Sequence, residues 1–133
     1  MTTQTRYTLA TRLDAPVADA RPLVEAALRG EGFGVLTEID VQATMKARLD
    51  IDGEPYLILG ACNPPLAHRA LTADPSVGAL LPCNVVLRAD GRGTIVEAMD
   101  PAAVMALVDD PELAAVAADA RARLERALAA LER

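Results

Sequence analysis

Four times in this chain an Asn or Asp directly precedes a proline, and this arrangement constrains the fold more than any other feature. The pairs are Asn63-Pro64, Asp74-Pro75, Asp100-Pro101 and Asp110-Pro111. The Asn or Asp oxygen accepts a hydrogen bond from an unpaired N–H of the first helical turn, and a proline there gives up a donor that had no partner. Each pair therefore predicts the start of a helix.

Alternating apolar residues, bounded by glycines and capping side chains, predict the remaining elements. Strands are expected at residues 7–13, 35–39, 56–61, 84–89 and 94–99, and the turn Asp90–Gly93 joins the last two as a hairpin. A helix is expected from about residue 14 to 29, and Asp40 is expected to cap a short helix at 41–49. The pattern predicts one α+β domain, 1–133, with a mostly antiparallel sheet of about five strands and helices packed on one face.

Two helical faces are predicted from their spacing. In the first helix Leu23, Ala27 and Leu28 are expected to face inward. Pro22 fits that helix in one of two ways: the helix starts near Asp19, or it kinks at the proline. In the last helix the inward face is expected to carry Leu113, Val116, Ala120, Leu124, Ala127 and Leu131.

The composition excludes several classes of function. The net charge is −6, and the three aromatic residues are two Tyr and one Phe, so both the basic field and the stacking surfaces of a nucleic-acid-binding protein are missing. The same charge argues against an anionic membrane surface. The sequence has no run of 18 apolar residues, and its first residues lack the pattern of a secretory signal. A cytoplasmic protein with free thiols is expected.

The reactive side chains gather between residues 62 and 84. They are Cys62, Asn63, His68, Cys83 and Asn84, and they include both cysteines and the single histidine. Cys62 comes just before a predicted helix cap, where unpaired N–H groups and the helix dipole would favour a thiolate. His68, one turn into the same helix, would serve as a base or a second ligand, and Cys83 is expected to point into the apolar layer with Val85 and Leu87. Both thiols lie at one end of the sheet if the two strands that carry them are neighbours.

Simpler interpretations of the same residues remain open. A buried free cysteine commonly behaves as a small hydrophobic side chain, and Asn63 needs no role beyond capping. A metal site would have Cys62, His68 and Cys83 as ligands, but it lacks the close cysteine pair of structural zinc sites. A disulfide between the cysteines requires Cα atoms within about 7 Å.

Three further blocks of the sequence are distinctive: Gly32–Asp40, Tyr56–His68 with its Gly-Ala-Cys-Asn-Pro-Pro segment, and Leu80–Leu87. Together they resemble the domain of unknown function 302 family, a group of bacterial and archaeal proteins. The resemblance implies a helix-backed antiparallel sheet, similar to the TATA-binding-protein-like class, and a homodimer. It implies no particular activity.

The residues favour a small-ligand-binding or thiol-redox-sensing protein centred on Cys62, with a metal ion, a sulfur species or a small anion as ligand. The alternatives are a structural or interaction homodimer without a reactive site and a metal-binding protein. Whether the protein catalyses any reaction is left open by the sequence.

Overall fold

The structure of the protein is a computed structural model that describes residues 3–132. Met1 and Thr2, part of the segment considered for a secretory signal, therefore lie outside the described residues, as does Arg133. The elements are β1 (Thr3–Gln4), β2 (Thr8–Leu13), α1 (Val17–Arg29), β3 (Gly34–Asp40), α2 (Val41–Leu49), β4 (Tyr56–Cys62), α3 (Pro64–Ala73), η1 (Pro75–Leu80, a 3₁₀ helix), β5 (Cys83–Asp90), β6 (Gly93–Met99), α4 (Pro101–Met105) and α5 (Pro111–Leu131).

The strands form a single antiparallel sheet in the order β1-β2-β6-β5-β4-β3. The five long strands are those that the sequence predicts, and the two-residue β1 adds a short edge. β5 and β6 form the expected hairpin, in which Asp90 pairs with Gly93. Gly91 adopts a φ of +60° in that turn, a conformation that glycine reaches without a steric penalty. The prediction of an antiparallel α+β fold is confirmed.

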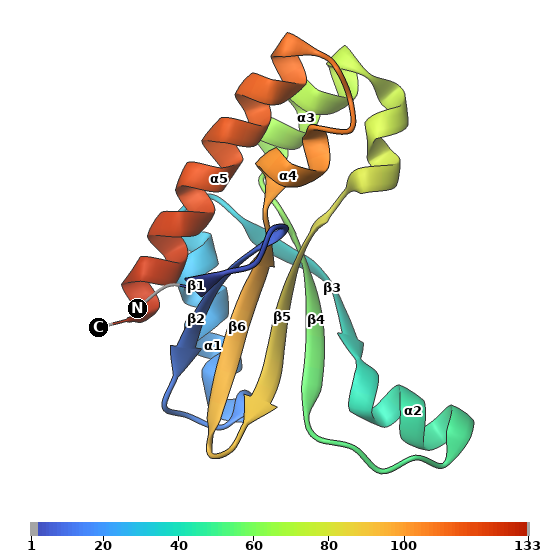
Figure 1. Ribbon diagram of the computed structural model, residues 1–133, viewed down its shortest axis with the longest axis vertical. Coiled ribbons are helices and arrows are strands. Elements are labelled where there is room, and N and C mark those ends of the chain that lie inside the picture. Colours follow the sequence, from blue (N-terminus) through green and yellow to red (C-terminus); the bar gives the residue numbers. More distant parts are fainter. Residues whose placement is uncertain (1–2, 133) are drawn as a thin grey trace.

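α1 and α5 pack beside each other on one face of the sheet (Figure 1). The core lies between these layers, because the inward-facing residues of the central strands meet the apolar stripes of both helices. Its fully buried side chains include Leu9, Val24, Leu59, Val85, Leu87, Val96 and Leu124. α3, η1 and α4 gather at one end of the sheet, while α2 extends from the body beyond β3 and β4 (Figure 1).

All four Asn/Asp-Pro pairs start helices, as predicted. α3, η1, α4 and α5 each begin at the proline, and the preceding side chain accepts an N–H of the first turn in every case. The bond from Glu112 N–H to Asp110 Oδ1 is 2.8 Å long, and that from Ala102 N–H to Asp100 Oδ1 is 2.9 Å long. The predicted cap of α2 also forms, from Ala43 N–H to Asp40 Oδ1.

The predictions for α1 need correction. The helix begins at Val17, so Pro22 is its sixth residue and lies beyond the first turn. Leu23 does not face inward and is 51% exposed; the buried stripe consists of Val17, Ala20, Val24 and Leu28. In the sequence alone, the buried i, i+4 stripe of this helix could contain either Leu23 or Val24. Packing against the sheet buries Val24 and leaves Leu23 exposed.

No helix within residues 3–132 is both long and apolar enough to cross a membrane.

Candidate functional site

Antiparallel pairing brings the two cysteines to the same end of the sheet. Cys62 is the last residue of β4 and Cys83 the first of β5, and in their register Ala61 is the partner of Cys83. Both thiols are free; Cys62 is half-buried, whereas Cys83 is 8% exposed. The two strands that carry the cysteines are therefore neighbours in the sheet, as a shared site for both thiols requires.

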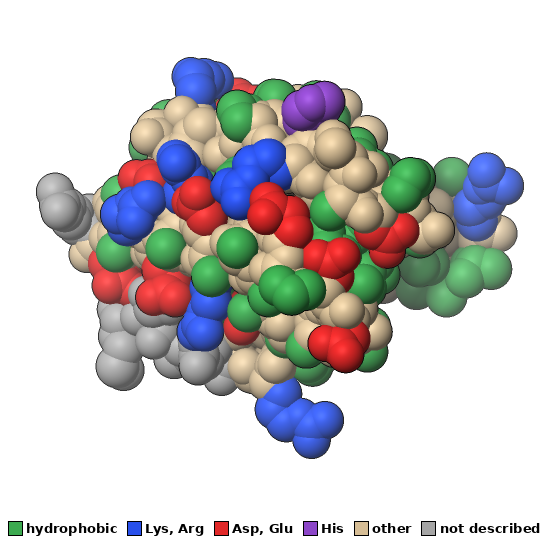
Figure 2. Space-filling model, turned by 90° about the horizontal axis from the view of Figure 1, so that it is seen from above, with side chains coloured by type: hydrophobic (Ala, Val, Ile, Leu, Met, Phe, Trp, Pro, Cys, Tyr) green, Lys and Arg blue, Asp and Glu red, His purple; other side chains and the backbone are tan. Residues whose placement is uncertain are grey.

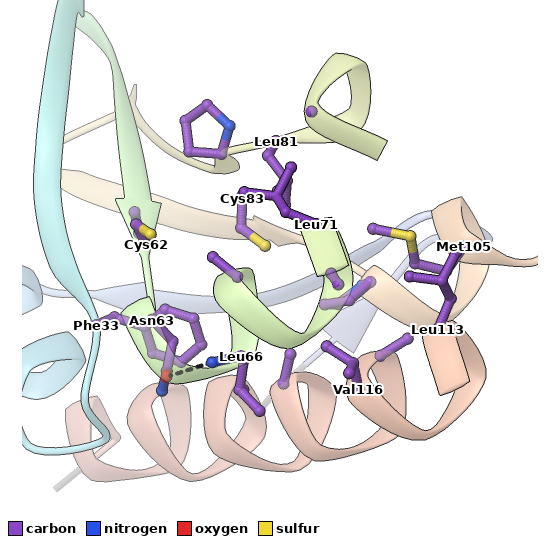
Figure 3. A pocket seen from close by; sticks show the side chains of 18 of the residues that line it. Phe33, Cys62, Asn63, Leu66, Leu71, Leu81, Cys83, Met105, Leu113 and Val116 are labelled. Atoms are coloured by element: carbon purple, nitrogen blue, oxygen red, sulfur yellow. Dashed lines mark hydrogen bonds between the residues drawn. The ribbon is translucent and has the colours of Figure 1, made fainter. Parts of the chain in front are cut away.

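A cavity of about 270 Å³ opens between this end of the sheet and the helices around it. Both cysteines belong to its lining, together with residues of α3, η1, α4 and α5. In Figure 3 Cys62 lies at one end of the drawn lining and Met105 at the other, with Cys83 between them. Near the outside, Leu36 is 67% and Leu71 41% exposed, so the cavity has an apolar rim.

Five alanines in the walls help to leave the cavity open. Ala67 and Ala70 line it from α3, Ala117 and Ala120 from α5, and Ala61 from β4. Helices and strands that met through leucine at these positions would fill the space, since protein interiors otherwise pack to high density. The alanine-rich composition thus leaves room for a ligand at one end of the core.

The lining, which falls entirely within residues 3–132, carries no charged side chain. Its polar groups are the two thiols and the amide of Asn63. Burying an ion or a strongly polar molecule without partners would cost several kcal/mol or more. The chemistry of the walls therefore favours an uncharged, mainly apolar ligand.

Asn63 holds the corner between β4 and α3. Its Oδ1 accepts from Leu66 N–H at 3.4 Å, and its Nδ2 donates to the Glu31 carbonyl at 3.3 Å. Gly32 lies next to this amide and has a φ of +86°. A Cβ at that position would lie 2.9 Å from Asn63 Nδ2. Asn63 therefore caps α3 and ties it to the loop before β3, which places Phe33 in the cavity wall.

The same corner leaves few donors for a thiolate at Cys62. The first two residues of α3 are Pro64 and Pro65, which have no N–H, and the N–H of Leu66 is taken by Asn63. The unpaired amide groups that the sequence interpretation assigned to Cys62 are thus absent from the first three positions of the helix.

Cys83 is a buried, protonated thiol. Desolvation raises its pKa from 9.0 to about 11, and the nearby Cys62 contributes in the same direction. Burial disfavours the charged form, so Cys83 behaves at neutral pH as a small hydrophobic side chain. Its predicted position in the apolar layer, on one face with Val85 and Leu87, is confirmed.

His68 does not join the cysteines, and this corrects the sequence interpretation. It is exposed and outside the cavity lining, and Figure 2 shows the histidine on the surface. Two residues advance a helix by roughly 200°, so His68 lies opposite the buried Leu66. Among residues 3–132, no three His, Cys, Asp or Glu side chains converge to hold a metal ion. The proposed ligand set of Cys62, His68 and Cys83 is therefore not assembled.

Asn84 is likewise separate from the cavity. It follows Cys83 in β5, so it points to the opposite face of the sheet, where it is exposed and pairs with Gly60. Gly60 has no room for a side chain: a Cβ there would collide with Thr37 Oγ1 and lie 2.9 Å from Pro82 Cγ. The two Cys-Asn pairs thus have different surroundings despite their similar sequences.

Most of the cavity wall was not predicted as part of a site. Leu66, Leu71, Met105 and Leu113 look like ordinary core residues in the sequence. The sequence did contain one indication of the cavity: small residues spaced three apart on one side of a helix, at Ala67 and Ala70 and again at Ala117 and Ala120. Nothing in the sequence, however, shows that these two helix faces meet.

The fold and the cavity together define a class: a small α+β protein with a helix-backed antiparallel sheet and an apolar, thiol-bearing cavity at one end. The chain belongs to the family described as "Domain of unknown function DUF302", whose model matches residues 9–131. It is similar to the crystal structure of an uncharacterized conserved DUF302 protein from Bacillus stearothermophilus, with a TM-score of 0.86 and 28% identity over 94% of this chain and 98% of that one. No curated protein sequence matches it. The predicted family is confirmed.

Proposed function

We propose that this protein binds a small, uncharged, mainly apolar molecule in the cavity between the ends of β4 and β5 and the helices α3 and α5. The observation that carries the proposal is the cavity of about 270 Å³ with two leucines at its rim and no charged side chain in its described lining. A dry cavity of about 150 Å³ lined by aliphatic and aromatic side chains binds benzene. The larger space here, about 270 Å³, fits an aromatic molecule of two or three rings or a medium-length alkyl chain.

The expected affinity is modest. Burying about 220 Å² of apolar ligand surface at ~25 cal/mol per Å² gives about 5.5 kcal/mol, which corresponds to a dissociation constant on the order of 0.1 mM. This affinity is an upper limit, because the freedom that ligand and side chains lose on binding weakens the affinity, and preorganised walls keep that loss small.

The ligand-binding half of the sequence hypothesis is better supported than the redox-sensing half. A disulfide-forming pair needs a second thiol that ionises readily, and the pKa of Cys83 is raised to about 11. A metal ion is also less well supported, because within residues 3–132 no three candidate ligand side chains converge and His68 lies outside the cavity that holds the cysteines. A small anion is less well supported because the first amide donors of α3 are missing or paired.

The test is a titration of trace N-phenyl-1-naphthylamine, a neutral apolar fluorophore, with increasing protein. We expect a saturable rise in fluorescence that disappears in Ala67→Leu, which fills the cavity from α3. The matched control is Ala115→Leu, the same change on the exposed side of α5, which should bind normally. No saturation, or equal binding by Ala67→Leu, would refute the proposal.

A second candidate, the homodimer implied by the family resemblance, is favoured by a separate observation. Leu36 and Ile39 of β3, Met45 and Leu49 of α2, and Ile51 are all exposed, and α2 buries none of its residues. Exposed apolar side chains concentrated in one segment commonly mark an interface. We propose that a second copy of the chain covers this β3–α2 segment (34–51).

Light scattering of the purified protein tests this pairing. The unmodified protein should have the mass of a dimer, and Leu49→Lys should have that of a monomer. Leu107→Lys is the control, because Leu107 is 80% exposed but lies outside the segment. A monomeric unmodified protein, or dissociation by the control, would count against the interface.

A further inference from the structure

The cavity holds a chemical group that a purely apolar ligand would not use. Cys62 is half-buried in its lining, and Cys83 is a nine-tenths buried thiol that also lines it. Neither of these two thiols forms a disulfide. Two free thiols of different accessibility thus line the space in which the ligand would lie (Figure 3).

We propose that Cys62 captures the ligand covalently, and that the ligand class is α,β-unsaturated carbonyl compounds with a medium-length aliphatic chain. The inference rests on the proposed function, since the chain would occupy the apolar cavity. The sulfur of Cys62 forms a bond to the β-carbon as the carbon–carbon double bond breaks. The thiol proton passes through water to the α-carbon. Atoms and electrons balance with no oxidant, reductant or leaving group, and the protein gains the full mass of the ligand.

The cavity, rather than any activation of the sulfur, supplies the selectivity. The prolines after Asn63 remove the amide donors that would stabilise a thiolate. A bound chain instead holds its reactive carbon beside Cys62, and such positioning raises the rate of a step through effective concentration. The reaction should therefore depend on the tail of the electrophile much more than it does for a thiol in solution.

The structure also explains why covalent capture would suit this site. Reversible binding at about 0.1 mM releases a small apolar molecule quickly, whereas a carbon–sulfur bond retains it. Cys83, deeper in the wall and protonated at neutral pH, would remain unmodified. One adduct per chain is expected, on the more accessible of the two thiols.

The experiment compares two electrophiles with the same reactive head, heptyl vinyl ketone and methyl vinyl ketone, on the intact protein at pH 7.5. Mass spectrometry measures the rate of adduct formation, and peptide mapping locates the adduct. The heptyl-to-methyl rate ratio for Cys62, divided by the same ratio for glutathione, should be about ten or more. Cys62→Ser should form no cavity adduct.

Ala67→Leu should reduce the ratio to that of glutathione, and Ala115→Leu should retain the ratio of the unmodified protein. If Ala67→Leu fails to fold, Leu71→Ala, which opens the rim, should shift the preference towards longer chains. A normalised ratio near one, or an adduct mainly on Cys83, overturns the inference. If naphthylamine binding persists in that case, reversible ligand binding stands without capture; if it is also absent, both proposals fail.

Discussion

At the scale of single residues, the two Cys-Asn pairs show how position in a sheet changes the role of identical side chains. Asn63 is buried and bonded through both ends of its amide, while Asn84 is exposed on the far face. Cys83 lies inside the core and Cys62 at its edge. The covalent step that we propose would therefore fall to the half-buried sulfur, whereas the buried amide holds the corner between β4 and α3.

Asn63→Ala should destabilise the protein by about 1–3 kcal/mol, because it removes the cap of α3 and leaves the Glu31 carbonyl without this donor. Asn84→Ala is the matched control and should change stability by less than about 0.5 kcal/mol. Urea unfolding of both variants measures the difference. Equal effects would show that the corner between β4 and α3 does not depend on the amide.

The raised pKa of Cys83 predicts a loss of stability at alkaline pH. The folded chain holds the thiol proton more tightly than the unfolded chain, so the stabilisation is fully present below about pH 9 and is lost as the pH rises towards 11. The loss attributable to this thiol should be at most about 3 kcal/mol, since each pKa unit corresponds to about 1.4 kcal/mol. Urea unfolding at several values of pH, with Cys83→Ala as reference, isolates it from tyrosine and lysine titration. Parallel curves for the two proteins would contradict the prediction.

At the scale of elements, the helix starts could be predicted because their cause is local. A cap and a proline act within one turn, and all four pairs begin helices at the expected residue. The inward face of α1 was assigned wrongly at Leu23, because that choice depends on the sheet against which the helix packs. His68 was misplaced for a similar reason: its spacing from Cys62 was known, but not which side of α3 would be covered.

Pro22 interrupts the backbone hydrogen bonding inside α1. As the sixth residue of α1 it has no N–H to donate to the Ala18 carbonyl, and its ring disturbs the preceding turn. Pro22→Ala should therefore stabilise the protein by about 1–2 kcal/mol, somewhat less than the cost of a helical proline because the unfolded chain gains freedom. Thermal unfolding measures the gain, and Leu23→Ala, at an exposed neighbour, should have little effect. A loss of stability in Pro22→Ala would contradict this prediction.

At the scale of the whole molecule, the cavity results from packing between segments far apart in the chain. β4 and β5 provide its floor, α3 one wall and α5 another, and the ion pair between Arg69 and Glu112, at 2.8 Å, links the two helices. The sequence located the cysteines and their neighbouring strands. It could not predict the cavity, because an alanine facing another alanine leaves a space only once both faces are known to meet.

Because the cavity is an unfilled space between packed elements, a substitution that fills it should increase stability and prevent binding. An unfilled apolar space forfeits contacts that its walls would otherwise make, and cavity-filling substitutions commonly add about 0.5–2 kcal/mol of stability. Ala67→Leu keeps a strong helix former in α3, so we expect it to raise the melting temperature while abolishing binding of the naphthylamine probe. Ala115→Leu should change neither by much. If Ala67→Leu instead lowers stability, the walls are already in contact in solution, and a molecule could enter only by forcing α3 and α5 apart.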